Sequence, residues 1–299
     1  MPFNQDQLTT LSQLAVEAAR AAGKVINTYR SSELEVQHKA VGDSIVSQVV
    51  TEADHKAQDA ILEILQPSLE EFGLAMLTEE SPDDGSRHRC QAFWCVDPMD
   101  GTYAFIHDAS GFSVSIGLVA QDGTPLIGVV YDPVEDDLYL AIKGQGAYKN
   151  NRSLKAPRLD FQRPLILRTD KSLKRDLRID EIREGVESIA KQLGLAGAEI
   201  VYRVGAVMNA CGILEDANIF YFKVPRVGDV GGSLWDYAAT ACLYNEAGAV
   251  ASDVFGQAME LNRVGSTFMN HRGLLYASDA GLAQHVIEMN RGLSAHSQA

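Results

Sequence analysis

The chain has 299 residues, of which 46% are hydrophobic and 22% charged, and its formal net charge at pH 7 is −14. This composition is typical of a water-soluble globular protein with one large domain or two fused ones, and no apolar run approaches the ~20 residues that span a bilayer. The negative charge repels a polyanionic backbone, which excludes nucleic acid as a partner and leaves a small anionic substrate possible only where local cations outweigh the global field.

The cysteines and the first ten residues indicate in which cellular compartment the protein works. Cys90, Cys95, Cys211 and Cys242 form no C-x-x-C pair, so neither a disulfide framework nor a zinc site is indicated. The start MPFNQDQLTT has neither a basic region nor an apolar signal core. We therefore expect a cytoplasmic protein with reduced thiols, and no membrane association.

Two helices are predicted first. Residues 8–29 carry apolar side chains at three- and four-residue spacings, the pattern of an amphipathic helix. A second helix is expected to begin at Thr51, where Thr51 and Asp54 form a capping signal, and to end near Pro67 and Gly73.

Strands dominate the next stretch. A strand over 93–96 is expected to stop at Asp97-Pro98, because proline removes a backbone donor. Apolar runs over 112–118 and 126–131 flank an Asp-Gly turn and predict an antiparallel hairpin, and 138–142 predicts a further strand. Helices packed on a meandering sheet make this half α+β.

The second half alternates strands and helices after a polar connection over 151–164, which predicts an α/β arrangement. The expected strands are 165–168, a segment near 200, and 219–224; the expected helices are 179–193, 207–214 and 234–248. We place the two halves at residues 1–155 and 156–299, and expect them to share one rigid interface.

The strongest local motif is VDPMDGT, residues 96–102. A turn at Pro98 could aim Asp97 and Asp100 at one point, and the Met99 carbonyl would add a third hard oxygen ligand suited to Mg²⁺. Gly101 would let the backbone approach a phosphate closely, with N–H groups of the following turn pointing at the anion. Taken alone, the motif is better explained as an ordinary Asp-Pro loop with an Asx-turn.

Three further acidic segments accompany this motif. Glu79 and Glu80 precede the strand that leads to Asp97, Asp54 lies at the expected start of the second helix, and Asp236 opens the last long helix. Each also has an ordinary explanation, as a solvated charged pair or as a helix-capping acid. Several carboxylates in one pocket would repel one another, however, and divalent cations there would reverse the local field and admit an anionic substrate.

The order of the motifs T-E-A-D (51–54), E-E (79–80), D-P-M-D-G-T (97–102) and W-D-Y-A (235–238) resembles the inositol monophosphatase superfamily over nearly the whole chain. That superfamily includes 3′(2′),5′-bisphosphate nucleotidases and some fructose bisphosphatases. Met99 replaces the commoner Ile or Leu, which matters little where the backbone carbonyl is the ligand. The resemblance implies a layered α-β-α-β-α sandwich with the active site between the halves, and a Mg²⁺-dependent, Li⁺-sensitive phosphomonoesterase.

The resemblance also implies a metal site of two or three Mg²⁺ ions. Glu79, Asp97 and the Met99 carbonyl would hold the first ion, and Asp97, bridging, would hold the second together with Asp100 and Asp236. These ions would clamp the phosphate and activate a water for in-line attack.

Four residues are expected to assist by the same resemblance. Asp54 and Thr102 would orient or deprotonate the attacking water, and Glu80 would support them without binding metal. The Gly101 and Thr102 amides would bind phosphate oxygens.

The substrate is a small phosphate ester of one of two kinds. The segments FWCVDPMDGTYAF, GVVYDPVEDDLYLA and FMNHRGLLYAS look closer to bisphosphate nucleotidases, and Arg168 and Lys171 could hold a second phosphate, although their basic run is equally explained as a solvated loop. Asp229 stands where relatives that bind an inositol or sugar hydroxyl place an acid. We favour the bisphosphate nucleotide, with an inositol or sugar monophosphate as the alternative.

A different class of function is a non-catalytic member that binds phosphate or a partner protein. No motif acid is missing, which argues against it, and phosphate release would discriminate between the classes. The family contains monomers and dimers, so a homodimer is compatible with the sequence.

Overall fold

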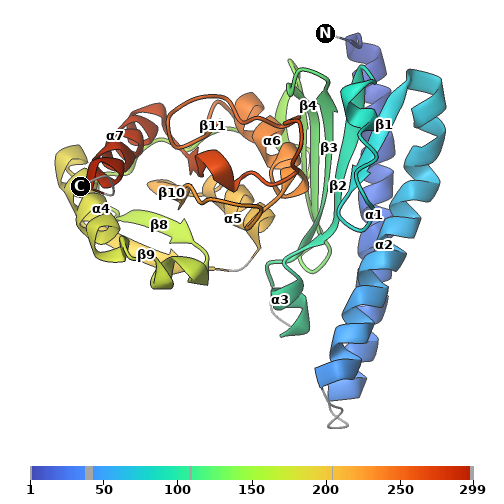
Figure 1. Ribbon diagram of the computed structural model, residues 1–299, viewed down its shortest axis with the longest axis horizontal. Helices are drawn as coiled ribbons and strands as arrows, with labels where there is room; N and C mark the ends of the chain where they lie inside the picture. Colours follow the sequence, from blue (N-terminus) through green and yellow to red (C-terminus); the bar gives the residue numbers. More distant parts are fainter. Residues whose placement is uncertain (1, 38–42, 108–109, 204, 297–299) are drawn as a thin grey trace.

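Two long helices form the first layer of the molecule. The structure, a computed structural model, describes residues 2–37, 43–107, 110–203 and 205–296. Helices α1 (Gln5–Gln37) and α2 (Asp43–Phe72) lie side by side along one face of a seven-stranded sheet (Figure 1). Their predicted amphipathic faces are buried there, with α1 contacting β4 and α2 contacting β2.

The first sheet has strand order β1-β2-β3-β4-β5-β6-β7, with β1 parallel to β2 and every other neighbouring pair antiparallel. Its strands are β1 (Leu74–Thr78), β2 (Ala92–Asp100), β3 (Ser113–Ala120), β4 (Pro125–Asp132), β5 (Asp137–Ile142), β6 (Gly146–Lys149) and β7 (Arg152–Leu154). Alternate residues serve opposite faces: Trp94 and Val96 pack toward α1 and α2, while Phe93 and Cys95 pack toward the second half. The predicted hairpin is the β3–β4 pair.

The second sheet has five strands in the order β11-β12-β10-β8-β9. They are β8 (Leu165–Thr169), β9 (Ala198–Tyr202), β10 (Ile219–Lys223), β11 (Val250–Ser252) and β12 (Leu274–Ala277). Strand β8 pairs in parallel with β9 and β10, as an α/β arrangement requires, and β12 runs antiparallel to β10.

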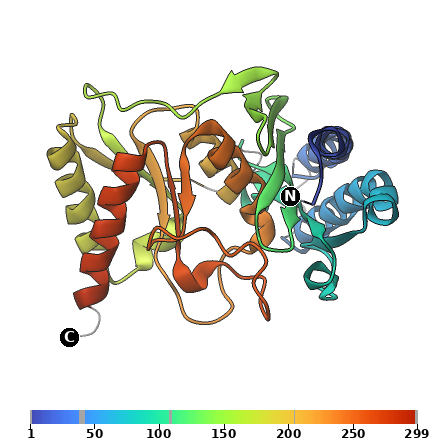
Figure 2. The same ribbon diagram turned by 90° about the horizontal axis from the view of Figure 1, so that it is seen from above.

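Helices fill the space between the sheets and cover the outer face. Between them lie α5 (Ala206–Ile213) and α6 (Ala238–Ala247), and α4 (Ile179–Leu193) and α7 (Ala280–His296) cover the far side (Figures 1 and 2). The layers thus run α-β-α-β-α, as predicted. The short helices are α3 (Thr102–Ile106), η1 (Ser86–His88), η2 (Lys171–Arg175), η3 (Leu234–Asp236) and η4 (Asn270–Arg272).

A glycine brings the second half against the first sheet. A Cβ at Gly128 in β4 would lie 2.1 Å from the carbonyl oxygen of Ala239 in α6, so only glycine permits this approach. Helix α6 therefore contacts β3 and β4 directly and carries the residues just before it toward the end of β2. The division at residue 155 stays a prediction, although β7 ends at Leu154 and β8 begins at Leu165.

The predicted start of α2 is wrong, and of the two residues predicted to mark its end Gly73 is right and Pro67 is not. The helix begins at Asp43, so Thr51 and Asp54 lie in its interior rather than at its start, and Pro67 lies inside it. Packing against α1 outweighs the local capping signal, because most helix stability in proteins comes from burying an apolar face. The helix stops only before Gly73, which has φ +64°.

Two other predictions also need correction. Strand β2 continues through Pro98 to Asp100, because a register shift between Asp97 and Asp100 absorbs the proline while both acids keep partners on β3. The helix predicted over 234–248 is divided into η3 and α6 at Tyr237. Among the described residues, no helix combines the length and apolar character that crossing a membrane requires.

Candidate metal centre and phosphate site

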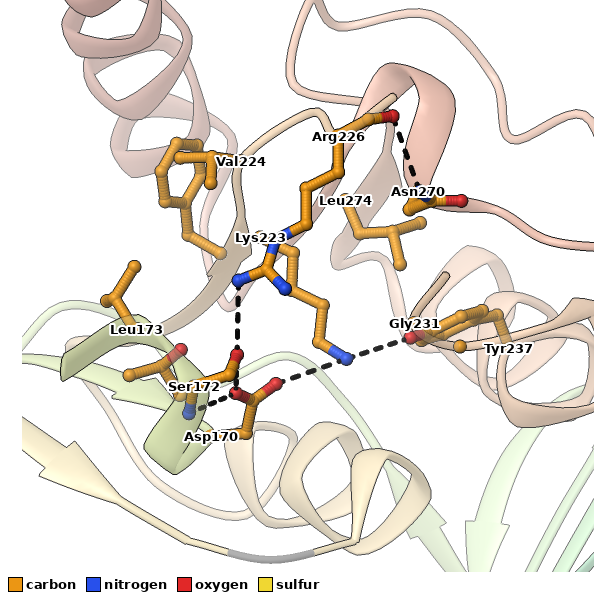
Figure 3. A pocket seen from close by; sticks show the side chains of 13 residues that line it. Asp170, Ser172, Leu173, Lys223, Val224, Arg226, Gly231, Tyr237, Asn270 and Leu274 are labelled. Atoms are coloured by element: carbon orange, nitrogen blue, oxygen red, sulfur yellow. Dashed lines mark hydrogen bonds and ion pairs between the residues drawn. The ribbon is translucent and has the colours of Figure 1, made fainter. Parts of the chain in front are cut away.

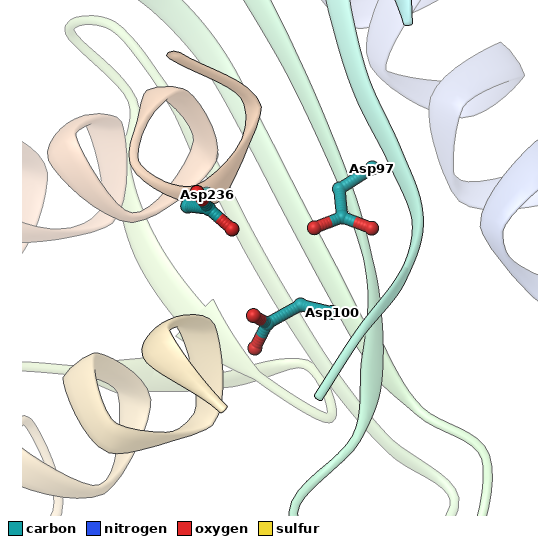
Figure 4. Close-up of side chains that lie close together, drawn as sticks. All are labelled: Asp97, Asp100 and Asp236. Atoms are coloured by element: carbon teal, nitrogen blue, oxygen red, sulfur yellow. The ribbon is translucent and has the colours of Figure 1, made fainter. Parts of the chain in front are cut away.

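Three carboxylates from two distant parts of the chain meet between the sheets. Asp97 and Asp100 come from the end of β2 and Asp236 from η3 (Figure 4), and one oxygen from each lies within 4.8 Å of the others. Asp97 is 1% exposed and Asp100 7%. Such a group of buried carboxylate oxygens is the donor set that a hard divalent cation prefers.

Backbone amides hold each carboxylate in place. Asp97 Oδ1 accepts a hydrogen bond from the Met99 amide at 2.9 Å, so the Asx-turn considered as an ordinary explanation is present within the cluster itself. Asp236 Oδ2 accepts one from the Ser233 amide at 2.5 Å, as part of a capping box at η3.

Asp100 is held by the second half of the molecule. Its carboxylate oxygens accept hydrogen bonds from the Ala206 amide at 3.2 Å and the Val207 amide at 3.0 Å, at the first turn of α5. Gly205 precedes that turn with φ +78°, a conformation that favours glycine. The β2 acid and the α5 amides therefore fix each other across the interface.

Glu79 and Asp54 border the cluster. The Glu79 amide donates to the Val96 carbonyl at 3.1 Å, which places Glu79 beside Asp97 at the ends of β1 and β2. Glu79 is exposed as a whole residue, but its carboxylate is buried. This burial and the charges of Asp236 and Glu80 raise the pKa of Glu79 to about 7, whereas a hydrogen bond with Asp97 lowers it. Burial, Glu80 and Glu79 raise the pKa of Asp54, on α2, to about 8.

The three clustered acids show the same direction of shift. Burial, Glu79, Asp100 and Asp236 raise the pKa of Asp97 well above its ordinary value. Burial and Asp236 raise the pKa of Asp100 to about 7 against the lowering by the α5 amides. Burial also raises the pKa of Asp236, opposed by the Ser233 amide and by Lys223. Carboxylates that resist ionisation together fit a site whose cation supplies the missing positive charge.

The loop predicted to bind phosphate follows the acids directly. Gly101 has φ +89° at the start of α3, and a Cβ there would lie 2.7 Å from the carbonyl oxygen of Gly111. Thr102 is the first residue of α3. The Met99 side chain is buried in the core against α1 and α2, so only its backbone is available to a ligand.

The residues predicted to select the substrate do not join the cluster. Asp229 is exposed in the loop after β10 and accepts a hydrogen bond from Ser266 Oγ at 2.7 Å. Arg168, in β8, and Lys171, in η2, line a cavity of about 530 Å³ beside α3.

Sequence reasoning missed Lys223, the last residue of β10. Its Nζ lies 3.2 Å from Asp170 Oδ2 and 3.2 Å from the Tyr237 hydroxyl, on the wall of a cavity of about 300 Å³ (Figure 3). Its charge lowers the pKa of Asp236, next to Tyr237 in the chain. In the sequence, Lys223 could have been recognised as the one charged residue at the end of the otherwise apolar strand IFYFK.

A layered sandwich with acidic residues gathered between its sheets defines a class of metal-dependent phosphatases. The sequence pattern described as the inositol monophosphatase family matches residues 7–291, and the chain belongs to that family. It is a phosphoric monoester hydrolase, as the motifs predicted.

Relatives and solved structures agree with this assignment. The chain is 30% identical to inositol monophosphatase 3 of Solanum lycopersicum (85% of this chain, 90% of the relative) and 28% identical to inositol-1-monophosphatase of Bacillus subtilis (83% and 87%). It is 31% identical to Nus factor SuhB of Escherichia coli K12 (81% and 85%). Inositol monophosphatase from Anabaena has a TM-score of 0.67 at 22% identity (95% and 97%), and inositol monophosphatase-II from Staphylococcus aureus 0.66 at 24% (94% and 95%). These structures confirm the fold.

Proposed function

We propose that this chain is a Mg²⁺-dependent, Li⁺-sensitive phosphatase that acts on a small inositol or sugar monophosphate. The convergence of Asp97, Asp100 and Asp236 carries the proposal, because it gathers hard oxygen donors beside a glycine loop suited to phosphate. The names of the relatives supply the substrate class, and so give more support to the inositol or sugar phosphate than to the bisphosphate nucleotide favoured by the sequence.

The protein's own groups would divide the work as follows. Glu79, Asp97 and the Met99 carbonyl would hold one ion, and Asp97, Asp100 and Asp236 a second. Bound there, Mg²⁺ supplies an activated water and neutralises charge on the phosphate.

The water and the phosphate would be positioned by residues around the cluster. Asp54 would accept a proton from the attacking water, and Thr102 would orient the same water. Glu80 would act by tuning Asp54, since its charge raises the pKa of that carboxyl. The Gly101 and Thr102 amides would receive phosphate oxygens.

The direct test is phosphate release from a panel: inositol 1-phosphate, fructose 1,6-bisphosphate, glycerol 2-phosphate, histidinol phosphate and adenosine 3′,5′-bisphosphate. We expect Mg²⁺-dependent turnover, with inositol 1-phosphate or a sugar phosphate best. If Asp229 contacts a substrate hydroxyl, Asp229→Ala will raise KM for that substrate. Full turnover in EDTA would remove the metal from the mechanism.

A bisphosphate nucleotide is the second candidate. It is favoured by one observation, that Arg168 and Lys171 line the same cavity. Highest kcat/KM for adenosine 3′,5′-bisphosphate in the panel would select it over the inositol phosphate.

Lithium sensitivity is a separate prediction of the two-ion site. We expect uncompetitive inhibition by millimolar Li⁺, through occupation of the site formed by Asp97, Asp100 and Asp236 after the ester is cleaved. Sodium chloride at equal ionic strength is the control, and equal inhibition by both salts would indicate screening instead.

A role as a binding protein is the alternative of a different class, and one relative is named as a Nus factor. The complete set of acids favours catalysis, and absence of phosphate release across the panel would reverse that preference. A cytoplasmic location and a homodimeric assembly stay predictions.

A further inference from the structure

The cavity beside α3 is lined by three cations from three different segments. Arg168 comes from β8, Lys171 from η2, and Arg203 follows β9. The cavity has a volume of about 530 Å³, enough for a phosphate group and part of an attached molecule. The sequence indicates Arg168 and Lys171 as phosphate ligands, and the fold adds Arg203 to them.

None of these cations has a carboxylate partner within the described part of the chain. Arg168 Nη1 makes one long hydrogen bond of 3.5 Å to the Asn209 carbonyl, and its Nε is buried without a partner. The Lys171 ammonium lies 5.0 Å from the centre of the Tyr103 ring. Burial and the nearby charge of Arg203 lower the pKa of Arg168. Arg168 is half-buried, whereas Lys171 and Arg203 are exposed. A half-buried guanidinium without a counter-ion is costly unless an anion joins it.

Four acids, Asp132, Glu135, Asp137 and Glu215, also line the cavity, and none of them forms a described ion pair with the three cations. Asp137 and Glu215 both pair with Lys149, at 2.7 Å and 2.6 Å. The Asp132 carboxylate accepts hydrogen bonds from the amides of Val134 and Glu135. The three cations are grouped on β8, η2 and the end of β9, and their donors without an ion pair offer an anionic ligand a binding place on that side of the cavity.

Gly111 connects the cavity to the acidic cluster. It lines the cavity, and a Cβ at Gly205 would lie 2.2 Å from the Gly111 carbonyl oxygen and 3.1 Å from Asp100 Oδ2. The cavity wall and the cluster are therefore separated by little more than the width of one backbone segment. A molecule whose scissile phosphate lies at the cluster could extend a second group toward the cations.

We propose that Arg168, Lys171 and Arg203 form a subsite that binds a phosphate group other than the one at the acidic cluster. The role of this subsite rests on the proposed phosphatase function. The phosphate group that it binds is either the second phosphate of a substrate or free phosphate beside the substrate. Arginine forks and a lysine ammonium are the donors that phosphate oxygens prefer.

The first experiment measures inorganic phosphate binding in EDTA, by phosphorus NMR titration at constant ionic strength. Without metal the acidic cluster repels phosphate, so binding reports the cavity. We expect Arg203→Ala and Lys171→Ala each to raise Kd at least tenfold, and Arg203→Lys to raise it less. Arg152→Ala, which removes one charge from the exposed edge of β7, should leave Kd unchanged. Circular dichroism checks that each variant is folded.

The second experiment identifies the source of the phosphate. With Mg²⁺ present, we compare kcat/KM for a doubly phosphorylated substrate with kcat/KM for a singly phosphorylated one. If the bound phosphate belongs to the substrate, the ratio of the first to the second should fall at least tenfold in Arg203→Ala and stay constant in Arg152→Ala. An unchanged ratio, together with lost binding in EDTA, assigns the subsite to free phosphate.

The subsite is refuted if wild-type protein binds no phosphate in EDTA, or if Arg203→Ala binds it equally well. The proposed function is contradicted by a different result, namely that wild-type protein with Mg²⁺ releases no phosphate from any substrate. The EDTA titration is independent of turnover, so the two failures are distinguishable.

Discussion

Asp97 is a residue whose burial by itself opposes folding. It is almost fully buried, and burial and three neighbouring carboxylates raise its pKa. Among the described residues, one amide, that of Met99, donates a hydrogen bond to its carboxylate. Burying a carboxylate without a counter-charge opposes folding. A residue in this position is best explained by a ligand that compensates for the charge.

Removing one of these charges tests that explanation. Asp97→Asn and Asp236→Asn preserve shape, but an amide cannot supply the charge that a hard divalent ion requires. We expect kcat/KM to fall by more than tenfold, about 1.4 kcal/mol of transition-state stabilisation, in a folded protein. Asp180→Asn, at an exposed position of α4, is the matched control. Either cluster variant that kept more than about a tenth of wild-type activity would contradict the metal assignment.

At the scale of elements, the start of α5 determines where Asp100 points. Its first two amides bind the Asp100 carboxylate, and Gly205 just before them packs against the backbone of Gly111. A strand end from the first half and a helix start from the second thus depend on each other.

Gly205→Ala tests this dependence. The new Cβ would meet the Gly111 carbonyl oxygen at 2.2 Å, and φ is +78°, so both a clash and backbone strain follow. We expect a loss of stability of about 1–3 kcal/mol or more, and a fall in kcat/KM as Asp100 shifts. Chemical denaturation and kinetics measure the two effects.

Gly194→Ala is the control for backbone strain alone, because Gly194 has φ +69° with nothing within 4 Å of its missing Cβ. We expect it to cost about 1 kcal/mol without reducing kcat/KM. Equal effects of the two substitutions on activity would show that the α5 contact does not position Asp100.

At the scale of the whole molecule, the acidic cluster lies on the interface between the two sheets. Asp97 and Asp100 belong to the first sheet, and Asp236 precedes α6, which packs between the sheets. The charge state of the cluster therefore affects how stably the two layers associate.

This arrangement predicts how stability depends on pH without metal. The pKa values of Asp54, Glu79 and Asp100 rise from 3.8, 4.5 and 3.8 to about 8, 7 and 7 on folding. A raised carboxyl pKa contributes stability below the unfolded-state value, and that contribution is lost as pH rises through the folded-state value. In EDTA the melting temperature should therefore fall between about pH 4 and pH 8.

Magnesium should reverse this loss, because it binds the ionised native cluster and hardly binds the unfolded chain. We expect the rise in melting temperature between EDTA and millimolar Mg²⁺ to be larger at pH 8 than at pH 5.5, as measured by differential scanning calorimetry. An Mg²⁺ effect that is absent, or equal at both pH values, would contradict the prediction.

Local pattern alone predicted much of the fold. The β3–β4 hairpin and helices α1 and α4 follow from periodicities of two and about 3.6 residues, which reflect side-chain direction in each element. The acids of the cluster were also named from sequence, because the spacing of Asp97 and Asp100 and the order of the other motifs are linear features. Whether they bind metal stays a prediction.

The tertiary structure decided the rest, because it depends on contacts between residues far apart in the chain. Packing on α1 extended α2 beyond the capping signal at Thr51, and pairing with β3 carried β2 through Pro98. No local pattern could reveal that Arg203 faces the same cavity as Arg168. The sequence by itself determined which acids are present and in what order, whereas their convergence, like that of the three cations, required helices of one half to pack against the sheet of the other.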